Sequence, residues 1–280
     1  MKTPKIIVHC LVKNEARFIW YSINSVLPYV DKIMVWDTGS TDKTVQIIKS
    51  IKSKKTHFKQ LNSITATQFP RVRQQMLKAT PKDYTWVMIL DGDEVWPQDS
   101  IKKVTHFCHR HPEYESIVIR TNNLVGDIYH RLPEPFGHYH LAGITGHLSL
   151  RFMNRKTIPG LNAKNPHGQQ GYFDSQNNLI QNRHPAKIKF LNVHYHHATH
   201  LSRSLSCSQD TSVIKRASKF KYQLGESIPK NQIPQIFFKP HSSLVPDVTR
   251  KAPLSFWVIS ALLTPLKAIN KILKPPKSGY

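Results

Sequence analysis

The chain has little cysteine and little acidic charge for its 280 residues. Its three cysteines, Cys10, Cys108 and Cys207, are odd in number and far apart, which excludes the disulfide framework typical of small secreted proteins. We therefore expect reduced thiols and a cytoplasmic protein. Only 17 Asp and Glu stand against 40 Lys and Arg, so the formal net charge is +23. Such an excess indicates a solvated basic surface or an anionic partner.

The sequence also lacks a long hydrophobic run. The longest mostly apolar stretch, residues 254–266, has 13 residues, and a membrane-spanning helix needs about 20. The apolar residues after Met1 are interrupted by Lys13–Glu15, so we expect no signal peptide. Zinc-finger spacing, aromatic RNA-binding motifs and a helix that concentrates the charge are missing as well. The composition therefore indicates no specific nucleic-acid partner.

Three carboxylates follow a predicted buried strand in the first third of the chain. Residues 86–90 are five consecutive apolar residues, typical of a strand buried on both faces of a sheet. Asp91, Asp93 and Glu94 come next, where open α/β sheets bind ligands, and Gly92 lets the backbone turn between the two Asp residues. Grouped oxygen ligands suit Mg²⁺ or Mn²⁺ carrying a phosphorylated substrate. An acidic turn after a core strand is the alternative.

Two strand–turn–helix units precede this motif. Residues 5–12 predict a strand followed by a helix over residues 16–26, and residues 32–36 predict a second strand. Asp37 ends that second strand and comes shortly before another helical pattern. Its carboxylate is placed to bond a ribose hydroxyl or a base edge, as in other nucleotide-binding sheets. The G-x-G-x-x-G of dinucleotide sites is missing.

These elements, taken in order, resemble the family 2 glycosyltransferases with the GT-A fold. The matching elements are V-K-N-E, V-D-x-I-x-V-x-D-T-G-S-T-D-x-T and D-x-D-E, within residues 5–97. The resemblance implies an α/β protein of GT-A type. Its mixed, mainly parallel sheet would be flanked by helices, with a Rossmann-like nucleotide-binding half and a C-terminal helical appendage. We expect the nucleotide-sugar half over residues 1–115, the acceptor-side half of the same domain over 116–247, and a basic amphipathic tail over 248–280.

The resemblance also implies a nucleotide-sugar donor, a UDP- or GDP-sugar, bound with Mn²⁺ or Mg²⁺. Asp37 would contact the nucleoside, Asp93 would bind the metal, and Asp91 would contact the ribose or reach the metal through water. The remaining residues expected to line the donor site are Val12, Asn14, Glu15 and Gly92.

An arginine is also expected at the donor. Relatives carry A-R-N before the D-x-D strand, and Val72-Arg73-Gln74 stands in that place here. Arg73 is therefore a diphosphate or nucleotide contact by resemblance. Arg71 is a rival for the same role.

The residue that takes the proton of the acceptor hydroxyl is left open by the sequence. Inverting sugar transfer needs a base, and the Glu-Asp pair that many relatives carry for it is missing from this chain. The candidates in the second half are Asp127, Asp174 and, as a neutral base, His167.

The densest group of histidines is at residues 194–200, after a predicted strand over residues 188–193. His194 and His196 share one face of that strand and His197 the other. GT-A enzymes commonly bring one such histidine to the metal, so His196 or His194 is expected to join Asp93. Exposed imidazoles at a strand end are the alternative.

The C-terminal tail combines an apolar patch with lysines. Residues 254–266 are mostly apolar, and Lys267, Lys271 and Lys274 fall together on another helical face. This pattern is typical of a helix that lies on an anionic membrane surface. A helix packed on the catalytic domain is the alternative.

Together these features predict a metal-dependent, inverting glycosyltransferase, peripheral on the inner face of the cell membrane. We expect its acceptor to be a cell-envelope glycan or a lipid-linked sugar. A polyprenyl-phosphate sugar synthase and a non-catalytic relative that binds nucleotide sugars or polyanions are the alternatives.

Overall fold

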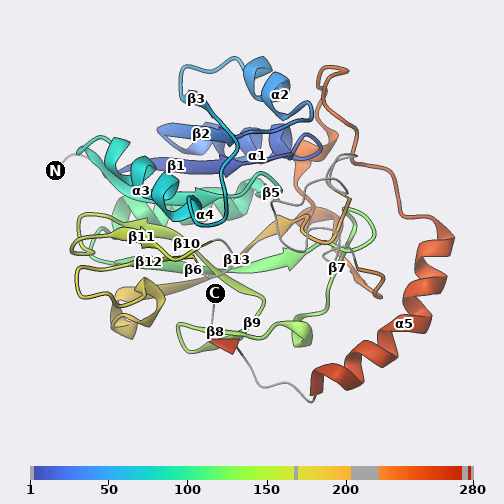
Figure 1. Cartoon of the computed structure of the whole chain (residues 1–280). Helices are drawn as coiled ribbons and strands as arrows, with labels where there is room; N and C mark the ends of the chain where they lie inside the picture. The colour runs from blue at the N-terminus through green and yellow to red at the C-terminus, as the bar shows by residue number, and fades with distance from the viewer. Residues whose placement is uncertain (1–2, 167–169, 203–220, 273–276, 279–280) are drawn as a thin grey trace.

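A mixed, mainly parallel sheet forms the centre of the molecule (Figure 1). The structure is a computed structural model that describes residues 3–166, 170–202, 221–272 and 277–278. The strand order is β3-β2-β1-β4-β10-β6-β13-β5. These strands are β1 (Lys5–Val12), β2 (Lys32–Thr38), β3 (Thr56–Leu61), β4 (Tyr84–Leu90), β5 (Glu94–Val95), β6 (Ser116–Asn123), β10 (Leu148–Asn154) and β13 (Ile188–His197). β5 and β10 run antiparallel to their neighbours and the other pairs are parallel. The predicted fold class is confirmed.

Helices cover both faces of this sheet because its buried strands are apolar on both sides. In β1, Ile6, Val8 and Cys10 belong to one core, while Ile7 and Leu11 belong to the other. The first core is covered by α1 (Ile19–Val26), α2 (Thr44–Ser50) and α4 (Gln98–Arg110). The second is covered by α3 (Phe69–Ala79) and the hairpin of β11 (Asn162–Lys164) and β12 (Gly171–Phe173). The two halves predicted from the sequence share the sheet, since β10 lies between β4 and β6.

Short strands and 3₁₀ turns form the stretch between β6 and β10. They are β7 (His130–Arg131), η2 (Glu134–Phe136), β8 (Tyr139–Leu141) and β9 (Ile144–Gly146). The other short elements are η1 (Leu27–Tyr29), η3 (Ile180–Asn182), η4 (Pro185–Lys187), β14 (Glu226–Ser227), η7 (Lys230–Gln232), η8 (Gln235–Phe238) and β15 (Lys277–Ser278).

The C-terminal region forms a single helix, α5 (Leu254–Ile272), with Pro265 inside it. Figure 1 shows this helix at the periphery, outside the layers that cover the sheet. Its first turn is anchored, because Phe256 packs in a small core with Val125 and Leu132. In the described part of the chain, no helix has the length and apolar character needed to cross a membrane. Lys274 and Cys207 lie outside the described residues.

Candidate functional site

Three loops meet at the carboxyl ends of β1, β2 and β4. In the parallel register Val12 lies beside Asp37, and Cys10 lies beside Leu90, the last residue before Asp91. The motifs V-K-N-E, D-T-G-S-T-D and D-G-D-E therefore lie next to one another, although 75 residues separate the first from the last in the sequence. This is the edge of an α/β sheet where ligands bind.

The first two loops are joined by backbone-to-side-chain hydrogen bonds. The amide of Asn14 donates to Ser40 Oγ at 2.8 Å, and the amide of Thr41 donates to Asn14 Oδ1 at 2.8 Å. The Glu15 amide donates to Thr44 Oγ1, also at 2.8 Å. Asn14 has a φ of 54°, a left-handed conformation that asparagine tolerates better than most residues. These contacts fix the two loops relative to each other.

Asp37 is fully buried at the start of the second loop. Its Oδ1 accepts hydrogen bonds from the amides of Gly39 and Ser40 at 3.1 and 3.0 Å, and its Oδ2 accepts one from the Ser40 hydroxyl. The carboxylate therefore shapes the turn that leads to α2. It stands at the end of β2, where the sequence predicts a nucleoside contact.

Gly92 lies against the first loop rather than in a left-handed turn. A Cβ atom at this position would be 2.8 Å from Glu15 Cγ and 3.0 Å from Val12 Cγ1. A side chain here would push the D-G-D-E turn away from the V-K-N-E loop. Glycine is thus required at this position because the two loops approach each other closely. The sequence suggests a different reason, a tight turn of the backbone.

Asp91 lies between two buried arginines. Arg73 of α3 donates to Asp91 Oδ1 and Arg151 of β10 donates to Asp91 Oδ2, each at 3.4 Å. The two guanidinium groups have side-chain exposures of 7% and 5%, whereas Asp91 is 35% exposed. Burial opposes ionisation of Asp91, but the charges of Arg151 and Arg73 outweigh it and hold the pKa of this carboxyl below its usual range. Asp91 is therefore an anion that faces solvent.

Arg73 and Arg71, the two arginines proposed for the same role, lie in different environments. Arg73 is 5% exposed and contacts Asp91, whereas Arg71 is exposed. The neighbouring Gln74 has a separate job, since its Oε1 accepts a hydrogen bond from the Ala163 amide at 2.8 Å. This bond ties α3 to the β11–β12 hairpin.

Glu94, the third carboxylate of the motif, forms a buried ion pair with Arg151, a residue that sequence reasoning did not assign to the site. Glu94 is fully buried and accepts a hydrogen bond from Arg151. Burial raises the pKa of Glu94 although Arg151 favours its charged form. The Arg151 guanidinium also lies 5.3 Å from the ring centre of Tyr195, a cation–π distance. The sequence did contain a signal for this pair, since Arg151 lies inside the mostly apolar residues 148–153. A cation buried in such a strand needs an acidic partner.

The histidine that lies beside Asp93 is His197, and not His194 or His196. His197 Nε2 is 3.4 Å from Asp93 Oδ2, and the side chain of His197 is 20% exposed. His196 is fully buried and its Nε2 is 2.9 Å from the carbonyl of Gln232, while His194 Nε2 is 3.1 Å from Gln232 Oε1. Burial lowers the pKa of His196 to about 3. As predicted, His194 and His196 share one face of the strand, where both contact Gln232. The face that meets Asp93 is the other one, which carries His197.

Asp127 and Asp174, two candidates for the catalytic base, hold loops in place. Asp127 Oδ1 accepts from the Tyr129 amide at 2.9 Å and lies 2.7 Å from His130 Nδ1, and its Oδ2 accepts from the Ala252 amide at 3.0 Å. It thus ties the start of the C-terminal region to the turn before β7. His167, the third candidate, lies outside the described residues.

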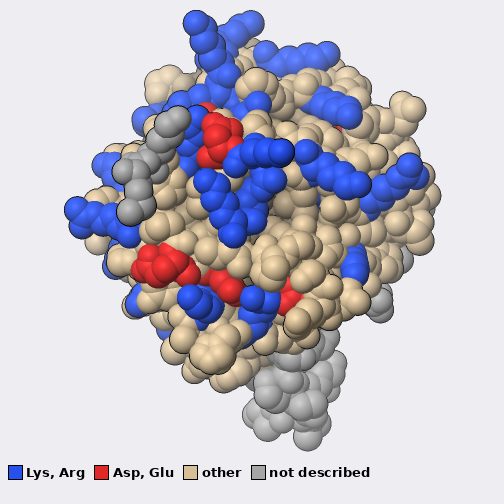
Figure 2. Space-filling model, turned by 90° about the vertical axis from the view of Figure 1, so that its left-hand side faces the viewer, with Lys and Arg blue, Asp and Glu red and all other residues tan. Residues whose placement is uncertain are grey.

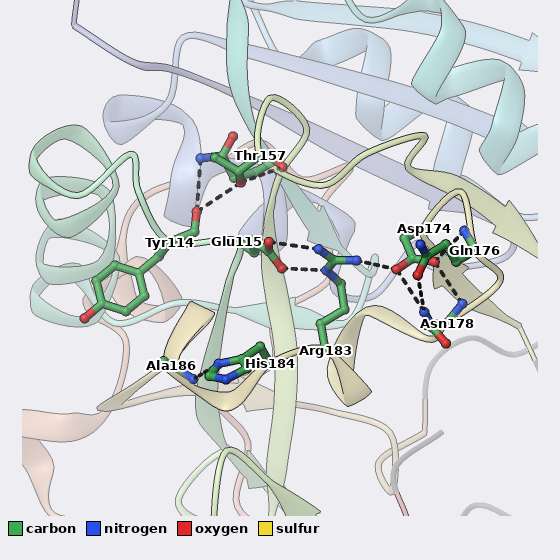
Figure 3. Close-up of polar contacts among 10 residues, drawn as sticks. Tyr114, Glu115, Thr157, Asp174, Gln176, Asn178, Arg183, His184 and Ala186 are labelled. Carbon is green, nitrogen blue, oxygen red and sulfur yellow. Dashed lines mark hydrogen bonds and ion pairs between the residues drawn. The ribbon is translucent and has the colours of Figure 1, made fainter.

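Asp174 is fully buried within a polar network (Figure 3). The amides of Gln176 and Asn178 each donate to its Oδ1 at 2.9 Å, and Arg183 donates to its Oδ2. Burial alone would raise the pKa of Asp174, but these hydrogen bonds outweigh it and lower the pKa. Arg183 continues to Glu115 through two further hydrogen bonds of 2.6 and 3.0 Å. Both oxygens of the Asp174 carboxylate are thus engaged in anchoring the loop.

The residues at the D-G-D-E turn offer part of a metal shell. Asp91, Asp93 and His197 supply carboxylate oxygens and an imidazole nitrogen, which Mn²⁺ and Mg²⁺ accept. Within the described ranges, no group of three or more His, Cys, Asp or Glu side chains is arranged to hold a metal by itself. The pair of Asp93 and His197 therefore fits a divalent cation if oxygens of a phosphorylated ligand complete its coordination, as is common for Mg²⁺.

Comparison with known proteins identifies the family. A family model described as "Glycosyl transferase family 2" matches residues 8–175. An "uncharacterized glycosyltransferase" of Rickettsia bellii is 34% identical over 92 residues, which are 33% of this chain and 29% of that protein. A TPR repeat-containing protein of Synechococcus elongatus is 33% identical over 84 residues, 30% of this chain and 19% of its own length. The match thus spans less than a third of either relative.

Two solved structures have a related arrangement at low similarity. The crystal structure of residues 1–349 of S. aureus TarS has a TM-score of 0.45 and 16% identity, over 70% of this chain and 60% of that one. The crystal structure of glucosyl-3-phosphoglycerate synthase from Mycobacterium tuberculosis, in complex with Mn²⁺, uridine diphosphate and glucosyl-3-phosphoglycerate, has a TM-score of 0.44 and 16% identity. That match covers 77% of this chain and 80% of that one.

Proposed function

This chain belongs to glycosyl transferase family 2, and we propose that it transfers a sugar from a nucleotide-diphosphate donor, a UDP- or GDP-sugar, to an acceptor hydroxyl with inversion. The observation that carries the proposal is the joining of three loops at one sheet edge. The loops after β1 and β2 are held together by hydrogen bonds of 2.8 Å, and the D-G-D-E turn packs against them through Gly92. Such a prearranged set of polar groups costs little reorganisation when a ligand binds.

Each loop contributes a different kind of group to the donor. The nucleoside would lie at the turn that Asp37 shapes, next to Asn14. Arg73 beside Asp91 offers a planar cation for phosphate oxygens. Asp93 and His197 would hold a divalent cation, Mn²⁺ or Mg²⁺. When bound, that cation would neutralise charge that develops on the leaving nucleotide.

Binding of nucleoside diphosphates tests this proposal. By calorimetry, UDP or GDP should bind more tightly with Mn²⁺ than without it, and Asp93→Asn should remove the gain from the metal. His197→Ala should reduce the gain and His194→Ala should not, because His194 faces Gln232. Asp83→Asn, an exposed carboxylate that pairs with Lys5, is the matched control. If the wild-type protein binds neither nucleotide, the proposed function is wrong.

We further propose that the acceptor is a cell-envelope glycan or a lipid-linked sugar, met at an anionic membrane surface. Support comes from α5, whose Leu254, Val258 and Leu262 are 79%, 53% and 71% exposed. These residues are four apart, so they form one apolar stripe along the helix. Arg250 and Lys251, just before the helix, add positive charge beside the stripe. A helix of this kind lies in a membrane interface and does not cross it.

A further inference from the structure

A hollow lies beside Asp91 on the face of the sheet that α3 covers. It is enclosed by α3, β4, β10, the β11–β12 hairpin and η3. The hollow contains about 620 Å³ of empty space, its opening to solvent included. Its walls are largely apolar, and the apolar lining residues are Pro70, Ile89, Leu150, Met153, Ala163 and Ile180.

Positive charge predominates among the side chains that line this hollow. Arg73, Arg151 and Lys164 are its cations and Asp91 is its only lining carboxylate among the described residues. Glu94 balances Arg151 from outside the hollow, so one cation remains in excess. The two arginines are 5% and 4% exposed in apolar surroundings, where electrostatic interactions are stronger than in water. The walls therefore favour an anionic occupant.

The face of the molecule where the β11–β12 hairpin lies is also basic. Figure 2 shows the face that lies at the left of Figure 1, where β11 and β12 are found, and Lys and Arg clearly outnumber Asp and Glu on it. A basic surface of this kind raises the local concentration of anions and speeds their association.

The walls of the hollow are fixed before any ligand binds. The Gln74–Ala163 hydrogen bond of 2.8 Å ties α3 to β11 on one side. On the other side the network of Asp174, Arg183 and Glu115 holds the turn after β12 and the segment that contains η3 (Figure 3). This network gives the buried Asp174, one of the three candidates for the catalytic base, a part in shaping the hollow.

On the basis of the proposed function, we propose that this hollow binds an anionic group, a phosphate or a carboxylate, carried by the sugar acceptor. Arg151, which the donor proposal does not use, has a planar group that matches phosphate and carboxylate oxygens, and Lys164 adds an exposed cation at the rim. The apolar walls suit the body of the acceptor. The hollow shares Asp91 and Arg73 with the donor loops, whereas Asn14 and Asp37 do not line it. An occupant would thus lie beside the donor without replacing the nucleoside.

Competition between ligands tests the inference. Protein saturated with UDP and Mn²⁺ is titrated by calorimetry with glucose 6-phosphate, glucuronate and glucose. We expect glucose 6-phosphate or glucuronate to bind, the stronger of the two showing whether phosphate or carboxylate is preferred, and glucose to bind at least tenfold more weakly. If saturating UDP displaces the sugar phosphate, the anion site is that of the donor diphosphate and the inference is wrong. Equal binding of glucose also contradicts it.

Variants of the walls locate the site. Ala163→Phe should fill the hollow and weaken glucose 6-phosphate binding at least tenfold while UDP affinity stays unchanged. Lys164→Glu reverses a charge at the exposed rim without altering the core, and should weaken the binding of glucose 6-phosphate several-fold. Lys103, an exposed lysine of α4 on the opposite face, supplies the matched control, and Lys103→Glu should change the affinity for neither ligand.

The failure of this inference is distinct from the failure of the proposed function. Tight UDP binding without any binding of glucose 6-phosphate or glucuronate overturns the inference alone. A wild-type protein that binds no nucleotide overturns the proposed function, and titration of the two anionic sugars into that protein still tests the hollow. Binding that Lys164→Glu and Ala163→Phe leave intact places the anion elsewhere and overturns the inference.

Discussion

Arg151 shows how one side chain of a central strand organises polar groups inside an apolar sheet. It contacts Asp91 and Glu94, and its guanidinium lies over the ring of Tyr195. Tyr195 in turn stacks on Trp96, with ring centres 5.3 Å apart. Removing a single member of such a buried pair leaves an uncompensated charge, which costs far more than the intact pair contributes.

We therefore expect Arg151→Met to lower the free energy of unfolding by about 3–5 kcal/mol, measured by urea denaturation at pH 8. The loss should be smaller at pH 5.5, because Glu94, whose pKa burial already raises, then takes up a proton. The double variant Arg151→Met with Glu94→Leu should recover most of the stability. Lys5→Met in the exposed Lys5–Asp83 pair should change stability little. Additive losses in the double variant would contradict the pairing.

Buried neutral histidines make stability depend on pH. His9 is fully buried with Nε2 2.8 Å from Thr80 Oγ1, and burial, helped by Arg73 and Arg155, lowers its pKa to about 3. In the unfolded chain the pKa is near its ordinary value of 6.5. Below pH 6.5 the unfolded state binds a proton that the folded state does not, so the free energy of unfolding falls as the pH falls.

The free energy of unfolding should fall by about 1.4 kcal/mol per pH unit for each such histidine between pH 6.5 and 3. When the pH is lowered from 6.5 to 5.0, the free energy of unfolding of His9→Gln should therefore fall by about 2 kcal/mol less than that of the wild type, measured by urea denaturation. His106→Gln, an exposed histidine of α4, should keep the wild-type slope. A full slope in His9→Gln would show that His9 is not held neutral in the folded protein.

At the scale of elements, α5 combines an anchor with an open apolar stripe. Phe256 is 5% exposed and packs on Val125 and Leu132, and Trp257 lies edge-on to His130 with ring centres 4.5 Å apart. A Cβ atom on Gly126 would lie 2.7 Å from Phe256, so this glycine lets the anchor approach the loop. The apolar stripe of Leu254, Val258 and Leu262 takes no part in these contacts and is exposed. The helix is thus docked on the domain at its first turn, while contact with a membrane stays a proposal.

We expect the two parts of α5 to respond differently to substitution. Phe256→Ala should lower the free energy of unfolding by about 3 kcal/mol, as for other buried Phe residues. The pair Val258→Ser and Leu262→Ser should leave stability nearly unchanged and reduce sedimentation with phosphatidylglycerol vesicles at low salt. Phe238→Ser, an exposed apolar residue outside α5, is the matched control. Vesicle binding that is equal in all variants, or absent in the wild type, would contradict the membrane proposal.

At the scale of the whole molecule, the two halves of the chain are interleaved in one sheet. β10 of the second half separates β4 from β6, and β13 pairs with β5, which begins at Glu94 of the donor loop. The register places His197 opposite Glu94, so Asp93 and His197 are brought together by this pairing. Residues 1–115, the predicted nucleotide-sugar half, are therefore incomplete without strands from residues 116–247.

This arrangement predicts a single cooperative unfolding transition for the sheet. Hydrogen exchange in increasing urea should give the same opening free energy for peptides from β4 and from β6 and β13, because neither half retains its sheet without the other. Peptides from α5 should open at lower free energy, since Leu254, Val258 and Leu262 of that helix are exposed. Separate transitions for β4 and β6 would show that residues 1–115 fold on their own.

Much of the fold could be predicted because the strands near the donor site are short, apolar and bounded by turn residues. Residues 5–12 and 84–90 form strands close to their predicted limits, and Asp37 and Asp91 stand where the strands end. The second half was harder to predict. Its strands come from distant segments and in a mixed order, and β10 runs antiparallel between two parallel neighbours. A hydrophobic pattern predicts that a strand exists but not which strand lies next to it.

The sequence by itself determined the family, the α/β character of the chain and the three polar loops, because local periodicity and turn chemistry act over a few residues. Only the tertiary structure decided the partners of those loops. It placed His197 beside Asp93 and His196 against Gln232, and it engaged Asp127 and Asp174 in loop anchoring. It also brought Arg151 to Asp91 from 60 residues away. The physical reason is that strand order and register, which local sequence does not encode, select the face and the neighbour that each side chain meets.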